Sequence, residues 1–253
     1  MKRILVFIAA SLLLVSCGMN KMKTEYFVYN ESVTLPDNAP EQMKSDTMKI
    51  SYNIALPVGE KWKDARETII KGVIAENEYA GDDTLSILTH IEGLKDMYFQ
   101  EFDSFMEDYA ENPNRSFMPP FAYEYVFDGD FAEPCKEKRF VNYKLSCECF
   151  TGGQHGMYWE TYFTFNPEDG GRVMLSDIVP QEKYSSLRDQ IYVKLTDNDG
   201  FVPDYISADS ELCTENFIVE DSCLTFIYNP YEVAPYSSGL IAISLSWEEV
   251  ESL

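Results

Sequence analysis

The sequence predicts an α+β protein in which mostly antiparallel sheets combine with about three helices, arranged as two intimately packed subdomains. Three observations support this prediction. Several short segments alternate apolar and polar residues, a few longer segments repeat apolar residues at helical spacing, and most links between strands are of hairpin length. No regular strand–helix–strand unit is visible, which disfavours a parallel doubly wound fold.

The first half of the chain contains one clear strand and two clear helices. Residues from Met48 to Leu56 alternate with a period of two, which predicts a half-buried strand. Apolar residues recur at helical spacing from Trp62 to Val73 and again from Leu94 to Tyr109. The aromatic and methionine stripe of the second helix lies opposite acidic residues, so it indicates core packing rather than a ligand site.

The second half is predicted to consist mainly of strands. Asn, Pro, Asp and Gly residues at 166–171 form a strong turn signal. A helix is expected to begin at Pro180 and to end in a glycine-type cap at 198–200. The predicted strands are 121–127, 141–149, 158–165, 172–175, 217–219, 224–228 and 240–245.

Composition excludes two classes of protein. The 253 residues include 43 acidic and 20 basic side chains, for a formal net charge of -23. Nucleic-acid binding is therefore not expected, because phosphate contacts need clustered cations. The hydrophobic fraction of 45% is enough for a packed core, which excludes a disordered acidic tail.

The N-terminus is predicted to be a lipoprotein signal peptide covering residues 1–17. Lys2 and Arg3 precede an apolar run, Ile4 to Val15, that is shorter than the roughly 20 residues needed to span a bilayer. The run ends in Leu-Val-Ser-Cys-Gly, which resembles a bacterial lipobox with Cys17 as the lipid attachment residue. An ordinary cleaved signal with a chance cysteine is the alternative.

A lipid on Cys17 would make the membrane a partner and would hold the chain at the cell envelope. Gly18, rather than Asp, favours the outer membrane, with the protein facing the periplasm. Residues 18–45 are assigned to a tether, within which Thr24 to Leu35 form either a short strand or a segment packed on the domain edge. The two predicted domains are an N-terminal α+β domain at 46–150 and a C-terminal α+β domain at 151–253.

Cysteine spacing leaves the disulfide pairing open. Five cysteines follow Cys17, and an odd number leaves at least one thiol free or paired with another chain. Cys147 and Cys149 lie on one face of a predicted strand, where a mutual bridge is disfavoured. Cys213 and Cys223 are spaced to close a hairpin-sized loop. With two histidines and no Cys-x-x-Cys, no metal site is expected.

Two separated motifs carry a family resemblance. Gly-Gly-Gln-His-Gly at 152–156 is followed by an aromatic strand and by Met-Leu-Ser-Asp-Ile at 174–178. Asn-Pro-Tyr-Glu-Val-Ala-Pro-Tyr-Ser-Ser-Gly follows at 229–239. This pattern resembles the extracytoplasmic domain of RsiV-like anti-sigma factors, which also precedes the catalytic domain of PdaC-like peptidoglycan deacetylases. The family is largely of unknown function. The resemblance covers 151–253, and 46–150 looks like the family's usual N-terminal partner domain.

The resemblance implies a binding or sensing module for a protein, lysozyme-like in the RsiV branch, or for a cell-wall glycan. The chain departs from the anti-sigma factors because no membrane-spanning helix or sigma-binding segment is visible. It departs from the deacetylases because it lacks their catalytic domain, and His90 and His155 are too few for their metal triad. Lysozyme binding is therefore expected by analogy only.

The candidate binding residues lie in the two motifs. Glycines let the first loop adopt unusual backbone angles and present His155, although a tight connector would have the same composition. The tyrosines of the second loop are suited to stack on a sugar or anchor a partner, although they would equally cap the core. The candidates are Gly152, Gly153, His155, Gly156, Trp159, Asn229, Tyr231 and Tyr236.

No enzymatic activity and no cofactor are predicted. The sequence contains no serine-hydrolase elbow, no His-Glu-x-x-His motif, no phosphate loop and no calcium loop. Pairs of carboxylates are common in so acidic a chain and are interpreted as solvated surface. The alternatives are a structural lipoprotein of the envelope and, less favoured, an unrecognised cell-wall hydrolase.

Overall fold

The computed structural model describes residues 22–74, 84–113, 118–132, 140–197, 206 and 212–253. The chain forms two compact units, each assembled from three segments. Unit 1 comprises Met1–Val58, Ile69–Asp128 and Cys147–Met157, and unit 2 comprises Gly59–Thr68, Gly129–Ser146 and Tyr158–Leu253. The predicted domains were continuous in sequence, whereas these units are interleaved. Cys17 and Cys135 lie outside the described residues.

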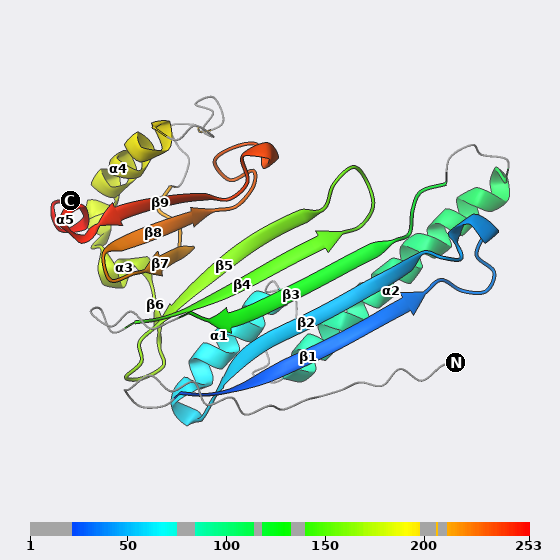
Figure 1. The fold of residues 1–253 in the computed structure, drawn as a ribbon, viewed down its shortest axis with the longest axis horizontal. Helices are drawn as coiled ribbons and strands as arrows, with labels where there is room; N and C mark the ends of the chain where they lie inside the picture. The colour runs from blue at the N-terminus through cyan, green and yellow to red at the C-terminus, as the bar shows by residue number, and fades with distance from the viewer. Residues whose placement is uncertain (1–21, 75–83, 114–117, 133–139, 198–205, 207–211) are drawn as a thin grey trace. The chain divides into compact units, whose positions relative to one another are not determined.

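Two sheets organise the described chain, and they confirm the predicted α+β class (Figure 1). The larger sheet has six strands in the order β1-β2-β3-β4-β5-β6, and the smaller sheet has three in the order β7-β8-β9. The strands are β1 Lys23–Thr34, β2 Thr47–Val58, β3 Tyr123–Phe131, β4 Val141–Phe150, β5 Met157–Phe165, β6 Arg172–Val173, β7 Phe217–Val219, β8 Cys223–Tyr228 and β9 Ile241–Ser246.

The helices include three that are longer than two turns, as predicted. They are α1 Lys63–Val73, α2 Thr84–Glu111, α3 Leu175–Ile178, α4 Tyr184–Thr196 and α5 Trp247–Glu251, with short 3₁₀ turns at Glu41–Met43, Glu60–Trp62, Gln181–Lys183 and Tyr236–Ser238. No helix within the described ranges combines the length and the hydropathy needed to cross a membrane.

Strand β1 lies within the segment that was assigned to the tether and covers 12 of its residues. It pairs antiparallel with β2 along its whole length, from Lys23 opposite Val58 to Thr34 opposite Thr47. Phe27 and Tyr29 are buried, while Asn30 and Ser32 are exposed, so the segment alternates as a half-buried strand does. Of the two alternatives for this segment, the strand is the one that forms.

The expectation that the chain lacks strand–helix–strand crossovers is wrong at one place. In Figure 1 the arrows of β2 and β3 point the same way, and α1 and α2 lie between them in the chain. Parallel neighbours require such a long connection, because a hairpin turn joins only antiparallel strands.

The core of unit 1 lies between its strands and α2. The rings of Tyr52 and Phe127 stack with centroids 4.4 Å apart, and His90 of α2 meets Phe127 edge-on at 6.0 Å. Tyr98 of α2 donates a hydrogen bond to the Phe121 carbonyl at 2.9 Å. Tyr98, Phe102 and Phe105 of the α2 stripe are therefore core, as the sequence predicted, whereas Met97 of the same stripe is exposed.

The core of unit 2 is formed by α4 and the smaller sheet. Leu187, Ile191 and Leu195 are fully buried at successive helical turns and belong to one cluster with Phe226 and Ile243. Complete burial of side chains of this size stabilises each by roughly 1.5–3 kcal/mol. This core fixes the ends of β8 and β9, and therefore the connection between them.

The described cysteines are all free thiols. Cys213 and Cys223 do not form the hairpin-closing bridge, and Cys147 and Cys149 are also unpaired. Burial raises the pKa of the Cys147 thiol well above its ordinary value. A thiol of this kind is held in its neutral form and acts as a small apolar core residue.

Candidate functional site

The connection between β8 and β9, residues 229–239, contains three of the candidate binding residues and is called the tyrosine loop. Val233 and Ala234 within it are buried in the core of unit 2. The Tyr231 N–H donates to the Ala234 carbonyl at 3.0 Å, and the Glu232 N–H donates to the Asn229 carbonyl at 3.1 Å. The loop is thus a compact turn that is anchored to the core of unit 2 by the side chains of Val233 and Ala234.

Tyr231 stands out in backbone conformation and in exposure. Among the described residues it alone, apart from glycines, has a positive φ, at 75°. Its side chain is 47% exposed. A left-handed conformation costs a residue with a Cβ roughly 1–2 kcal/mol, because Cβ approaches the following carbonyl. The surrounding loop must hold Tyr231 in this conformation, since an exposed ring gains little from packing.

Three tyrosines form a continuous aromatic group in unit 2. The ring of Tyr236 lies 5.8 Å from that of Tyr231 and 5.6 Å from that of Tyr158 at the start of β5. Tyr158 and Tyr236 are half-buried. We call Tyr158, Tyr231 and Tyr236 the tyrosine surface. Tyr158 is a member that the sequence did not single out.

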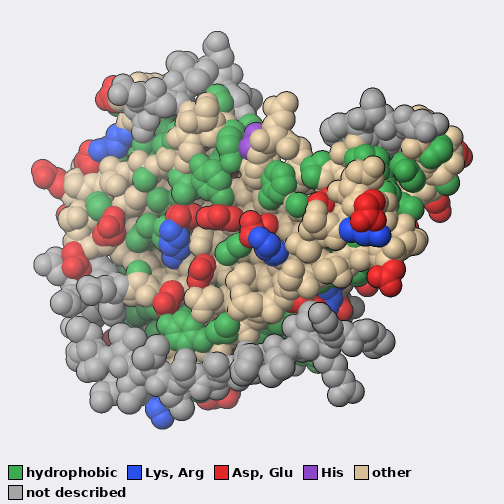
Figure 2. All heavy atoms as spheres, turned by 45° about the vertical axis from the view of Figure 1, so that its right-hand side comes forward, with side chains coloured by type: hydrophobic (Ala, Val, Ile, Leu, Met, Phe, Trp, Pro, Cys, Tyr) green, Lys and Arg blue, Asp and Glu red, His purple; other side chains and the backbone are tan. Residues whose placement is uncertain are grey.

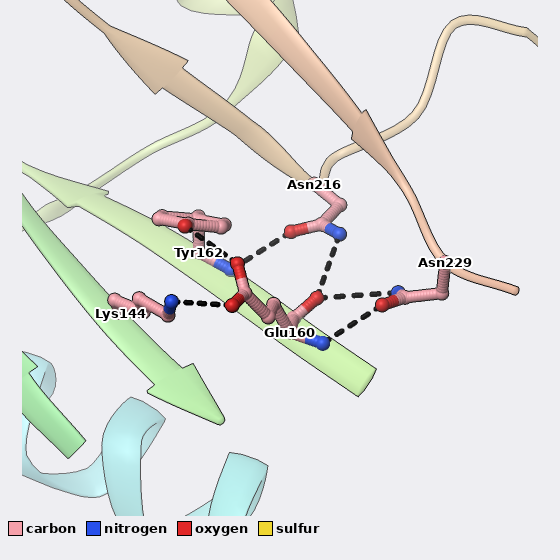
Figure 3. A network of polar contacts seen from close by, with 5 residues as sticks. All are labelled: Lys144, Glu160, Tyr162, Asn216 and Asn229. Carbon is pink, nitrogen blue, oxygen red and sulfur yellow. Dashed lines mark hydrogen bonds and ion pairs between the residues drawn. The ribbon is translucent and has the colours of Figure 1, made fainter. Parts of the chain in front are cut away.

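Asn229 fixes the start of the tyrosine loop to β5 (Figure 3). Its carboxamide oxygen accepts from the Glu160 N–H at 2.7 Å, and its NH₂ donates to the Glu160 carbonyl at 3.2 Å. These two bonds reproduce the pairing that a neighbouring strand would make. The Asn229 N–H in turn donates to the Glu232 carboxylate at 2.7 Å.

Asn216 binds the same strand in the same manner, just before β7. Its side-chain oxygen accepts from the Tyr162 N–H at 2.8 Å, and its NH₂ donates to the carbonyls of Glu160 at 2.9 Å and Ile227 at 3.1 Å. Strand β6 pairs with β5 only at Thr164 and Phe165. Nearer the start of β5, the two asparagines form hydrogen bonds with the backbone groups of Glu160 and Tyr162, which the short β6 does not reach.

The side chain of Glu160 completes this polar network. Its carboxylate forms an ion pair with Lys144 of β4 and accepts a hydrogen bond from the Tyr162 hydroxyl at 2.8 Å (Figure 3). Burial, followed by the hydrogen bond to Glu160, raises the pKa of Tyr162 above its ordinary value. Every polar group of Glu160 is therefore used within the chain, which indicates a scaffold rather than a reactive site.

The glycine-rich loop, residues 151–156, joins β4 to β5. Gly152 and Gly153 adopt positive φ angles of 88° and 93°, and a Cβ on Gly156 would meet the Cys149 carbonyl oxygen at 2.8 Å. These glycines are therefore required by the backbone. His155 is exposed, and its Nδ1 lies 2.9 Å from the Gly156 carbonyl.

The structure brings only some of the predicted residues together. Asn229, Tyr231 and Tyr236 share the tyrosine loop, and Trp159 is half-buried on β5. The glycine-rich loop belongs to unit 1. Sequence reasoning missed Glu160, Asn216 and Lys144, because their contacts join strands that are far apart in the chain.

Among the described residues, no group of three or more His, Cys, Asp or Glu side chains is arranged to hold a metal ion. The one acidic side chain labelled in Figure 3, that of Glu160, contacts Lys144 and Tyr162 instead.

Comparison with known proteins finds a family model that matches part of the chain. Residues 165–248 match the model of a family described as protein of unknown function (DUF3298). No curated protein matches the sequence. The family match begins at the end of β5 and includes the tyrosine loop.

Two solved structures share the fold over almost the whole chain. A member of the DUF3298 family from Bacteroides fragilis has a TM-score of 0.72 and 21% identity, and the alignment covers 92% of this chain and 93% of that one. A DUF3298 family protein from Pseudomonas aeruginosa PAO1 has a TM-score of 0.57 and 13% identity, with 91% and 93% covered. At these identities the likeness establishes the fold. The RsiV-like resemblance is compatible with it.

Proposed function

We propose that this chain is a non-catalytic binding or sensing module, held at the cell envelope by a lipid on Cys17, whose partner is a cationic, lysozyme-like protein. The observation that carries the proposal is Tyr231, an exposed aromatic side chain kept in an unfavourable backbone conformation. Strain of this kind persists where the surroundings over-determine it, and it concentrates at sites of function.

The tyrosine loop is built as a presentation site, by which we mean a rigid loop that holds an exposed side chain in a fixed position for a partner. Asn229 and the buried Val233 and Ala234 fix its backbone, so Tyr231 is ordered before any partner arrives. Tyrosine is enriched among the residues that contribute most to protein–protein binding, because it buries a large area with little loss of rotamer entropy. A pre-ordered tyrosine therefore suits recognition of a protein.

Charge favours a cationic partner. The chain carries a formal net charge of -23, and acidic side chains recur across the face shown in Figure 2, with few Lys and Arg between them. Glu232 is exposed next to Tyr231. Such a field accelerates encounter with a positively charged protein and is screened by salt.

The test is a calorimetric titration of the protein with hen egg-white lysozyme. We expect binding that weakens by about tenfold or more when the salt concentration rises from about 0.05 M to about 0.5 M. Tyr231→Ser should weaken binding by about thirtyfold, corresponding to a loss of roughly 2 kcal/mol at a central tyrosine. The control is Tyr192→Ser, which removes a tyrosine on α4 that is 40% exposed. Equal losses in both variants would contradict the proposal.

The anchor is tested separately. Cells expressing the full chain should incorporate labelled fatty acid into it, and Cys17→Ser should abolish the incorporation. The control is Cys223→Ser, which removes a half-buried thiol near the C-terminus. Labelling that survives in Cys17→Ser would place the lipid elsewhere or overturn the anchoring proposal.

A further inference from the structure

A groove of about 550 Å³ lies on unit 1, across strands β1, β2 and β3. Its volume falls within the roughly 300–1,000 Å³ that small-molecule sites occupy. The groove is lined by Asn30, Glu31, Ser32, Lys49, Ile50, Ser51, Glu124, Tyr125 and Val126. None of these residues was singled out by the sequence, and none belongs to the tyrosine loop.

Strand alternation explains which side chains face the groove. Asn30, Ser32, Lys49 and Glu124 are exposed, whereas Ile50 and Tyr125 are buried on the opposite, core-facing side of the sheet. Ser32 pairs with Lys49, and Asn30 pairs with Ser51. The buried neighbours contribute backbone to the floor.

Some polar groups that line this groove form no hydrogen bond or ion pair with other described residues. The Asn30 side-chain oxygen accepts from the Ser51 hydroxyl at 2.9 Å, which leaves both N–H groups of its amide for another partner. Within the described ranges, Lys49 makes no ion pair, and Glu124 makes none either. Other described lysines do find carboxylates, as Lys95 does with Glu31 and Glu92.

The groove is also balanced in charge, unlike the protein as a whole. Lys49 and Glu124 contribute one positive and one negative charge, and Glu31 is paired with Lys95, which it shares with Glu92. A charged ligand would meet a like charge at either Lys49 or Glu124. A neutral ligand with many hydroxyl groups can donate to Glu124 and accept from Lys49 and Asn30 at the same time.

We propose that the groove across β1, β2 and β3 is a binding site for a neutral oligosaccharide. The Glu124 carboxylate, the Lys49 ammonium and the Asn30 amide would bond to sugar hydroxyls, and Val126 would contact the apolar face of a ring. Charge-assisted hydrogen bonds of this kind are stronger than those between neutral groups, which suits recognition of hydroxyls in water. This site is separate from the tyrosine surface and does not depend on the function proposed for it.

The test is titration of the full chain with three neutral probes, namely chitotetraose, cellotetraose and maltotetraose. At least one should bind, with an affinity that is nearly unchanged between about 0.05 M and about 0.5 M salt, since a neutral ligand is not screened. Glu124→Gln and Lys49→Met should each lower the association constant about tenfold, the loss expected for a hydrogen bond to a charged group.

Matched variants keep the test decisive. Glu148→Gln on β4 and Lys23→Met on β1 change exposed side chains outside the groove and should leave binding unchanged. Ser32→Trp fills the hollow from an exposed position, so it should abolish binding while far-ultraviolet dichroism and Tm stay as in the parent. The proposal is overturned if none of the three probes binds at about 10 mM, if binding survives Ser32→Trp, or if only charged oligosaccharides bind. Lysozyme binding is measured separately, because it tests the function proposed for the tyrosine surface and not the saccharide site.

Discussion

The tyrosine loop and the β1–β3 groove use polar groups in opposite ways. In the tyrosine loop the polar side chain of Asn229 forms its hydrogen bonds with backbone groups of β5, and the exposed group is the aromatic ring of Tyr231. In the groove the backbone is satisfied by regular strand pairing, and the exposed groups are an amide, an ammonium and a carboxylate. The difference teaches that buried or half-buried polar contacts build the scaffold, whereas groups left over on a rigid surface are available for a ligand.

The largest effect on stability is expected for Asn229→Ala, which tests whether the polar contacts of the tyrosine loop form a scaffold. The substitution leaves the Glu160 N–H without its partner at a half-buried position, while the Glu160 carbonyl keeps its bond from Asn216, and an unsatisfied group of this kind costs about 1–3 kcal/mol. We expect the free energy of unfolding to fall by about 2–3 kcal/mol in urea denaturation. Glu232→Gln, which alters only the outer bond to Asn229, should cost less than about 1 kcal/mol. Equal effects would mean that the network is not a scaffold.

Tyr231→Gly should change stability in the opposite direction. Glycine adopts a φ of 75° without the Cβ penalty, and the exposed ring contributes little packing. We expect the free energy of unfolding to stay level or to rise by at most about 1 kcal/mol, because the entropy that glycine gains in the unfolded chain offsets part of the relieved backbone strain. A loss of more than about 1 kcal/mol would show that Tyr231 is a structural cap and would remove the main support for a presentation site.

His90 tests the core beneath the groove. Its Nε2 is buried and has no hydrogen-bond partner among the described residues, and burial lowers the pKa of His90 below 6.5. As the pH falls through 6.5, His90 therefore binds a proton in the unfolded chain but not in the folded chain. The contribution of neutral His90 to the free energy of unfolding is fully present above pH 6.5 and decreases below it. The loss cannot exceed about 1.4 kcal/mol per pH unit. His90→Leu should flatten the difference in unfolding free energy between pH 7.5 and 5.5, and an unchanged slope would contradict the burial argument.

The smallest effect is expected in the groove itself. Ser51→Ala removes one hydrogen bond to Asn30 at a solvated surface. Surface substitutions of this kind change stability by about 0.5 kcal/mol or less. Thermal melting should detect almost no shift in Tm. A large loss would mean that the groove polar groups belong to the scaffold, as those of the tyrosine loop do.

Short-range patterns predicted much of the fold. The alternation from Met48 to Leu56 and the helical stripe from Leu94 to Tyr109 depend on neighbouring residues, and both elements formed. Strand β1 was harder to predict, because Asn30, Glu31 and Ser32 dilute its alternation and its strand pairing with β2 supplies the missing stabilisation.

The candidate sites were predicted less completely, for a physical reason. The sequence indicated Tyr231 and Tyr236, because prolines and tyrosines within one loop are visible locally. It did not reveal that Asn229 bonds to Glu160, 69 residues away, or that Ser32, Ser51 and Val126 line one groove. Such arrangements depend on strand order and register, which only the folded chain determines.

Amide hydrogen exchange with each ligand in turn tests the separation of the two regions most directly. Hen egg-white lysozyme should slow exchange in residues 229–239 and leave 30–32, 49–51 and 124–126 unchanged, and a bound neutral tetrasaccharide should do the reverse. If both ligands protect the same residues, or if lysozyme protects none of the tyrosine loop, the assignment of one region to protein contact and the other to saccharide is contradicted.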